Sequence, residues 1–190
     1  MSDKSAIKRF FGAALTVLVI GVLIAPAVQA KDVPIYIEYT GTGHDLLHPM
    51  FGDPLPDNIV LADAKGSFGA KSTAIIVKFG PPPAIEDPCK EGYTFLGIVY
   101  ARAVTSFKDG SQLFATVIPG DESHMCLNQL NGHYDGSVFG VFIGGNGRFE
   151  GVTGGTFVSP FDGYNLTSAF DGEFPFRSIK GSFDGTVKFD

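Results

Sequence analysis

The sequence lacks several features that would point directly to a function. It has no tryptophan and only two cysteines in 190 residues, and beyond residue 30 it shows almost no helical periodicity. It has no cluster of lysines and arginines, which binding to nucleic acids or anionic membranes requires. It also has no nucleophile elbow, phosphate-binding loop or nucleotide fingerprint. These absences argue against a nucleic-acid partner and leave no familiar catalytic motif.

The first feature that the sequence does contain is an export signal. Three basic residues precede an apolar run over residues 10–24, and Pro26 follows the run. Ala27-Val28-Gln29-Ala30 then offers the small residues that a signal peptidase reads. We predict cleavage after Ala30 and a secreted or periplasmic protein without membrane contact. The alternative is an uncleaved anchor, because the apolar stretch approaches the roughly 20 residues of a spanning helix.

Removal of residues 1–30 leaves one domain, residues 31–190, with 11 basic and 19 acidic residues and a net charge of −8. A chain of this length can bury a sizeable core as a single unit. Cys89 and Cys126 form an even pair in an oxidising compartment, which favours a disulfide between them. Two buried thiols are the alternative.

The mature chain has the pattern of an all-β domain, a single small antiparallel barrel of about eight strands. Ile35, Ile37 and Tyr39 alternate with polar residues, as in a strand with one buried face. We expect loops over residues 41–58 and 81–88. The expected strands cover residues 35–40, 60–68, 73–79, 94–107, 112–118, 134–143, 148–158, 165–170 and 178–189.

Turn chemistry suggests a register for these strands. Asp109-Gly110 between two apolar runs predicts a tight hairpin. Two-residue turns at Asn146-Gly147 and Asp162-Gly163 would set aromatic residues opposite glycines, whose gaps the rings then fill. The pairs predicted in this way are Phe142 with Gly151, Phe157 with Gly136, and Phe170 with Gly155.

A Gly-x-aromatic-x-Gly pattern recurs along the chain. Its copies are Gly132–Gly136, Gly147–Gly151 and Gly181–Gly185, with a partial copy at Gly66-Ser67-Phe68. Glycine weakens a strand unless the chain must bend there or another surface comes close. Repetition on neighbouring strands is therefore typical of a small, strongly coiled barrel.

The segment Phe142-Ile143-Gly144-Gly145-Asn146-Gly147-Arg148-Phe149-Glu150-Gly151-Val152-Thr153-Gly154 resembles the glycine-rich hairpin of the allene oxide cyclase and dirigent-type barrels. The similarity continues loosely through the last third of the chain. This resemblance implies an eight-stranded antiparallel barrel with an apolar inner cavity, and a homotrimer in many members. The known enzymes of that superfamily steer cyclisation or radical coupling without a metal. Only the glycine hairpin, residues 144–154, matches well, so we carry no catalytic residue of the family over to this chain.

Two faces of the barrel wall compete as its interior. One carries His133 and Asp135 on one strand, and Arg148 and Glu150 on the next. If that face is internal, a few polar groups surround an apolar pocket, as in small-molecule sites. The other face carries the glycine-paired aromatic rings. The catalytic candidates are therefore Glu150, Asp135, His133 and Tyr134, and the ligand-binding candidates are Arg148, Phe142, Phe157, His44 and His48.

His44 and His48 have the spacing of two metal ligands on a helix. Pro49 follows them and Gly41-Thr42-Gly43 precedes them, so a helix cannot extend here. We expect no metal and no cofactor. A loop over the barrel mouth would still let either histidine touch a ligand.

Three functions fit these observations. The first is a barrel that binds a small apolar or aromatic molecule in its cavity. The second is a cofactor-free cyclase, isomerase or coupling-directing enzyme that acts on such a molecule. The third is an oligomeric scaffold. An apolar hollow favours the first function, a hollow with buried acids the second, and a filled interior the third.

Overall fold

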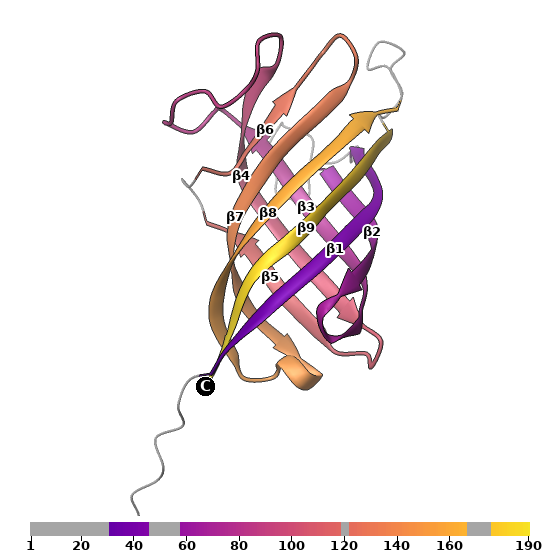
Figure 1. The fold of residues 1–190 in the computed structure, drawn as a ribbon, viewed down its shortest axis with the longest axis vertical. Helices are drawn as coiled ribbons and strands as arrows, with labels where there is room; N and C mark the ends of the chain where they lie inside the picture. Colours follow the sequence, from indigo (N-terminus) through magenta and orange to yellow (C-terminus); the bar gives the residue numbers. More distant parts are fainter. Residues whose placement is uncertain (1–30, 46–57, 119–121, 167–175) are drawn as a thin grey trace, which may run out of the picture.

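The computed structural model describes residues 31–45, 58–118, 122–166 and 176–190. Their strands curl into a closed antiparallel barrel, and the first and last strands lie side by side (Figure 1). The strands are β1 (Lys31–Asp45), β2 (Asn58–Gly66), β3 (Ala70–Gly80), β4 (Thr94–Phe107), β5 (Gln112–Val117), β6 (His124–Leu127), β7 (His133–Asn146), β8 (Val152–Asn165) and β9 (Phe176–Phe189). Two single-turn 3-10 helices, η1 (Ser67–Gly69) and η2 (Gly147–Phe149), lie in turns.

The barrel has eight strand positions, because β5 and β6 share one of them. Going round the wall, β1 pairs with β2, β2 with β3, and β3 with β4, while β7, β8 and β9 lead back to β1. Between β4 and β7, β5 pairs with one half of each neighbour and β6 with the other half. Both segments run antiparallel to β4, so β6 continues the direction of β5. The predicted all-β barrel is confirmed.

Three local predictions were wrong. Residues 41–45 continue β1, because Gly41 to Asp45 pair with β2 on one side and Gly41 to His44 with β9 on the other. A strand at His124–Leu127 was not expected. Asp162-Gly163 makes no turn: both residues lie inside β8, which runs on to Asn165. The expected strand at residues 165–170 therefore does not begin at Asn165, and Phe170 lies outside the described residues.

The turn between β7 and β8 is also longer than its sequence suggested. It includes η2, in which Phe149 is buried to 1% exposure, so the ring holds the turn against the barrel interior. As a result Phe157 opposes Gly140 rather than Gly136, and Phe142 does not oppose Gly151. Gly136 and Gly140 lie on the same face of β7, so the predicted face of Phe157 was still right.

Aromatic rings do cover glycines across neighbouring strands, with partners that differ from the predicted ones. A Cβ added at Gly140 would collide with the ring of Phe157. In the same way, Phe161 covers Gly136, Tyr134 covers Gly163, and Tyr39 covers Gly181. These glycines make room inside the wall for rings that would not otherwise fit a barrel of eight strands.

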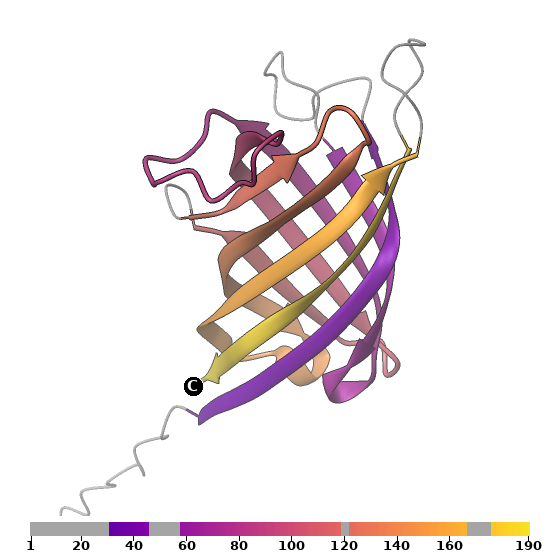
Figure 2. The ribbon, with the colours of Figure 1, turned by 45° about the horizontal axis from the view of Figure 1, so that its top comes forward.

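One end of the barrel is filled by phenylalanines that we call the floor cluster. The two 3-10 turns lie at the end where β1 begins and β9 ends (Figure 2), and they contribute Phe68 and Phe149 to the cluster. The centroids of Phe107 and Phe149 are 4.6 Å apart, and Phe68 meets Phe149 edge-on at 5.5 Å. Burying a phenylalanine contributes about 1.5–3 kcal/mol. The members of the floor cluster are Phe68, Phe107, Phe142, Phe149, Phe157, Phe183 and Phe189.

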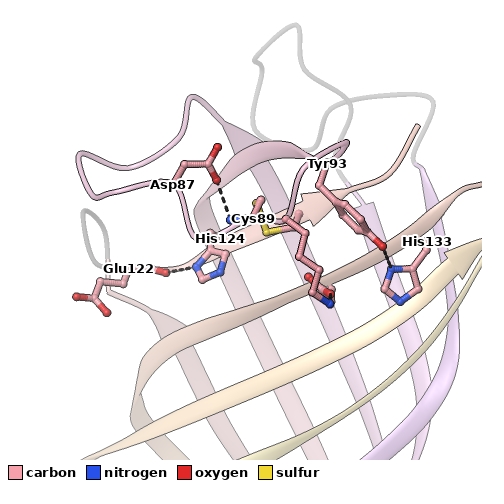
Figure 3. Close-up of a disulfide and its surroundings, with 9 residues drawn as sticks. Asp87, Cys89, Tyr93, Glu122, His124 and His133 are labelled. Atoms are coloured by element: carbon pink, nitrogen blue, oxygen red, sulfur yellow. Dashed lines mark hydrogen bonds and ion pairs between the residues drawn. A yellow bond between two sulfur atoms is a disulfide. The ribbon is translucent and has the colours of Figure 1, made fainter. Parts of the chain in front are cut away.

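The predicted disulfide is present. Cys89, in the loop between β3 and β4, is bonded to Cys126 of β6 (Figure 3). The bridge closes a loop with a sequence separation of 37 residues. In the chain-entropy account, a loop of that length stabilises the fold by about 3–4 kcal/mol. The bridge therefore fixes the long loop of residues 81–93 to the short strand β6.

The ring over Gly140 predicts a difference between two glycine-to-alanine variants. Gly140→Ala should lower the free energy of unfolding by about 1–3 kcal/mol, because its methyl group must displace the Phe157 ring. Gly154→Ala is the matched control, because nothing lies within 4 Å of a Cβ at that position. Chemical denaturation of both variants measures the difference. Equal stability of the two variants would contradict the assigned register.

Candidate functional site

The barrel contains a cavity of about 70 Å³ next to the floor cluster, whose members Phe157 and Phe183 form part of the cavity wall. Its wall is apolar, with side chains contributed by every strand position. The apolar residues that line it are Val60, Ile75, Val77, Phe79, Ile98, Ala101, Ala103, Ala115, Val117, Met125, Val138, Phe157, Phe161, Ile179 and Phe183. The void is about half the size of an engineered 150 Å³ cavity that binds benzene. It fits a compact molecule, and Met125 offers a flexible side chain that can yield to a larger one.

Two tyrosines carry polar groups into this apolar space. The Tyr39 hydroxyl lies 3.1 Å from Oγ of Ser159, and the Tyr134 hydroxyl donates a hydrogen bond to the Ser178 carbonyl at 2.8 Å. Burial raises the pKa of Tyr39 to about 12, and burial also raises the pKa of Tyr134. Both phenols are therefore uncharged at neutral pH.

A charged group lies where β1, β2, β8 and β9 come together, and we call it the rim cluster: Asp45, Asn58, Asn165 and Arg177. The Arg177 guanidinium donates to Asn165 at 3.0 Å and to Asn58, and it lies 3.0 and 3.2 Å from the two oxygens of Asp45. Arg177 and Asn58 line the cavity. Burial raises the pKa of Asp45, against the opposing effects of Arg177 and His44. The cluster therefore presents a paired charge to the cavity.

The structure decides which face of the wall is internal: it is the glycine-paired face. Tyr134 and Phe157 line the cavity, and Phe142 packs in the core with its ring centroid 5.1 Å from that of Phe157. His133, Asp135, Arg148 and Glu150 do not line it. Of the catalytic candidates, only Tyr134 reaches the cavity. Glu150 is exposed directly after η2.

His133 and Asp135 connect the outer wall to the loop of residues 81–93. Nδ1 of His133 is 2.9 Å from the Tyr93 hydroxyl (Figure 3). Nε2 of the same ring is 3.9 Å from Asp162. Asp135 lies 3.9 Å from the Lys90 ammonium group. Together with the disulfide, these contacts hold the loop against the barrel.

Arg148 belongs to the floor end of the barrel. Its guanidinium donates two hydrogen bonds to Asp109 and one, at 3.3 Å, to the Phe68 carbonyl. Phe68 has φ +58°, a left-handed conformation that is rare for a bulky residue. Arg148 therefore holds the turn that directs Phe68 into the floor cluster. His44 is half-buried near the end of β1, beside Asp45, and His48 lies outside the described residues.

The sequence pattern did not identify Ser159, Asn58 or Arg177 as cavity residues. Tyr39 was visible only as part of the alternation that begins at Ile35. The rim cluster joins residues that are 119 and 132 positions apart, so nothing in a local pattern signals it. It depends on the ends of β1 and β8 and the beginnings of β2 and β9 meeting at one end of the barrel.

No protein-family model matches this chain, and no curated protein or solved structure matches it either. None of the described segments forms a helix of the length and apolarity needed to cross a bilayer. Within the described ranges, no three histidine, cysteine, aspartate or glutamate side chains gather as metal ligands do. The cavity and its lining are therefore the basis for a functional proposal.

The contacts of Asp109 predict a measurable titration. A hydrogen bond from Ser111, together with the Arg148 guanidinium, lowers the pKa of Asp109 to about 2. Because the folded state favours the carboxylate, this stabilisation is present above the ordinary pKa of 3.8 and is lost as the pH falls toward 2. Ser111→Ala and Arg148→Ala should each raise the pKa toward 3.8 in a carboxyl-carbon NMR titration.

Glu150→Gln is the control for this titration, because Glu150 lies in the neighbouring turn and is not among the groups that shift Asp109. It should leave the Asp109 pKa unchanged. An Asp109 pKa that stays near 2 in both Ser111→Ala and Arg148→Ala would contradict the described clamp.

Proposed function

We propose that this protein is an exported β-barrel that binds a small apolar or aromatic molecule in its internal cavity. The observation that carries the proposal is an apolar hollow above a floor filled with phenylalanines. Small-molecule sites have this composition: apolar walls with a few fixed polar groups. Here the polar groups include two uncharged phenols, a serine and a paired arginine, and Asn58, Arg102 and Thr116 complete the polar lining.

The lining favours binding over the other two functions. A scaffold needs no hollow, and its interior would be expected to be filled throughout. A cofactor-free enzyme needs an acid or base at the substrate, but the described side chains that line the cavity include no carboxylate and no histidine. Asp45 is the one specific observation that favours an enzyme, because it lies beside the cavity and burial raises its pKa. Under that second function, Asp45→Asn would abolish turnover.

Two observations support export. The disulfide fits an oxidising compartment, since cytosolic thiols are kept reduced. The described part of β1 begins at Lys31, so cleavage after Ala30 would leave every described strand intact. The closed antiparallel barrel is also the architecture that the hairpin resemblance implies. Membership of the allene oxide cyclase and dirigent-like superfamily, and a homotrimer, are parts of the same proposal.

Export predicts the N-terminus and the disulfide state of the protein in its own host. Protein purified from the exported fraction should begin at Lys31 and weigh two hydrogens less than its reduced form, because both cysteines are joined. Intact-mass spectrometry before and after reduction measures both properties. If the exported protein retains residues 1–30, or if both cysteines are free thiols, this part of the proposal is wrong.

Ligand binding predicts that filling the cavity abolishes the uptake of small apolar molecules. Xenon and toluene, titrated into the domain of residues 31–190, should shift the NMR signals of methyl groups that line the cavity. Ala101→Phe should remove the response, because Ala101 lines the void and a ring would occupy it. Toluene additionally tests whether the side chains that line the cavity can move apart to admit an aromatic ring.

Val104→Phe is the matched control, because Val104 lies on the outer face of the same strand and is 36% exposed. It should bind both probes as the unmodified protein does. Asp135→Asn and Glu150→Gln should also leave binding unchanged, since neither residue lines the cavity. If neither probe shifts any cavity signal in the unmodified protein, the binding function is wrong.

A further inference from the structure

Two buried hydroxyl groups meet inside the apolar cavity. Tyr39 comes from β1 and Ser159 from β8, and their exposed fractions are 3% and 2%. Their oxygen atoms are 3.1 Å apart, and both residues line the void. The Tyr39 ring lies over Gly181 with its centroid 5.2 Å from that of Phe183. The phenol is thus held by packing, with its hydroxyl at the cavity.

These two hydroxyls have hydrogen-bonding capacity to spare. A phenol and a serine together offer two donor protons and about four acceptor lone pairs. Their mutual hydrogen bond uses one proton and one lone pair. One proton remains for a third partner, and a buried donor without an acceptor is costly. The pair is therefore suited to receive one acceptor atom.

Other polar side chains that line the cavity have partners of their own, and the Thr116 hydroxyl donates to the Ala101 carbonyl at 3.0 Å. The Tyr134 proton is donated to the Ser178 carbonyl. The Arg177 guanidinium is occupied by Asp45, Asn58 and Asn165. An anionic ligand at Arg177 would put a second carboxylate beside Asp45, whose charge is already disfavoured by burial. The Tyr39–Ser159 pair is thus an uncharged donor within the apolar part of the cavity, whereas the Asn58 amide belongs to the rim cluster.

We propose that Tyr39 and Ser159 form a subsite for one uncharged acceptor oxygen, a carbonyl or ether, on an otherwise apolar ligand. This inference rests on the proposed binding function and narrows its ligand class. Gly181, under the Tyr39 ring, is four residues along β9 from Arg177, or about 13 Å at the rise of a strand. The ligand oxygen therefore points toward the floor cluster, and its apolar body extends toward the rim cluster.

The test compares two probes of nearly the same shape, cyclopentanone and methylenecyclopentane, which differ in C=O against C=CH₂. Their dissociation constants are measured by NMR titration of cavity methyl groups. In the double variant Tyr39→Phe/Ser159→Ala, cyclopentanone should bind about threefold to tenfold more weakly, the usual effect of one lost hydrogen bond. Methylenecyclopentane should change less than about twofold, since it makes no hydrogen bond. Each single variant keeps one hydroxyl able to donate and should retain most of the ketone affinity.

Thr105→Val is the matched control. Thr105 and Thr73 form another buried hydroxyl pair, with oxygens 3.2 Å apart, but neither residue lines the cavity. This variant should leave the affinity of both probes unchanged. A measurement on the unmodified protein adds an independent readout: the carbonyl stretch of bound cyclopentanone should lie at lower frequency than in an alkane solvent.

The outcomes separate this inference from the binding function. If both probes bind but the double variant weakens neither, or weakens both equally, the subsite is wrong and the binding function stands. An unshifted carbonyl stretch in the unmodified protein likewise overturns the subsite. If neither probe binds the unmodified protein, the binding function fails and the subsite fails with it.

Discussion

The packing of aromatic rings against glycines on neighbouring strands is the constraint on which this barrel depends. A wall of eight strand positions has a narrow interior, and several rings fit there because the neighbouring strand has no side chain beneath them. Gly140 under Phe157 and Gly181 under Tyr39 provide such places. Once these rings are fixed, the register of each strand pair and the identity of the inner face follow, because a slip by one residue would turn every ring to solvent.

The same short glycine–aromatic pattern builds two different parts of the molecule. In the turns, Phe68 and Phe149 fold back and fill one end of the barrel, and positive φ at Gly66 and Gly147 permits the sharp reversal. Within the strands, Tyr134 and Phe183 stand on the inner wall. The result is asymmetric along the barrel axis: one end is filled by rings, and the other retains space bounded by smaller side chains such as Ala101.

Much of the fold could be predicted from the sequence, but less of the site. Alternation, turn residues and cysteine count predicted the all-β barrel, the disulfide and the position of Phe157 on the glycine-paired face, because these follow from local patterns. Which of the two faces is internal could not be predicted, since both carried apolar residues. The length of the β7–β8 turn could not be predicted, since it depends on the burial of Phe149. Gly41 resembled a loop residue. It is a glycine because the backbone of β2 lies directly against it, and the sequence of β1 alone does not reveal that contact. Arg177 gave no signal, since its partners are brought to it only by closure of the barrel.

That closure has a consequence for the order of folding. β1 and β9 are joined along almost their whole lengths, from Lys31 opposite Phe189 to His44 opposite Phe176. The seam of the barrel therefore unites the first and the last of the described strands. Contacts so distant in sequence form late and slowly, because the loop entropy is lost before the pairing can compensate for it. Neighbouring strands can pair earlier, but the wall closes only when β9 is free to join β1.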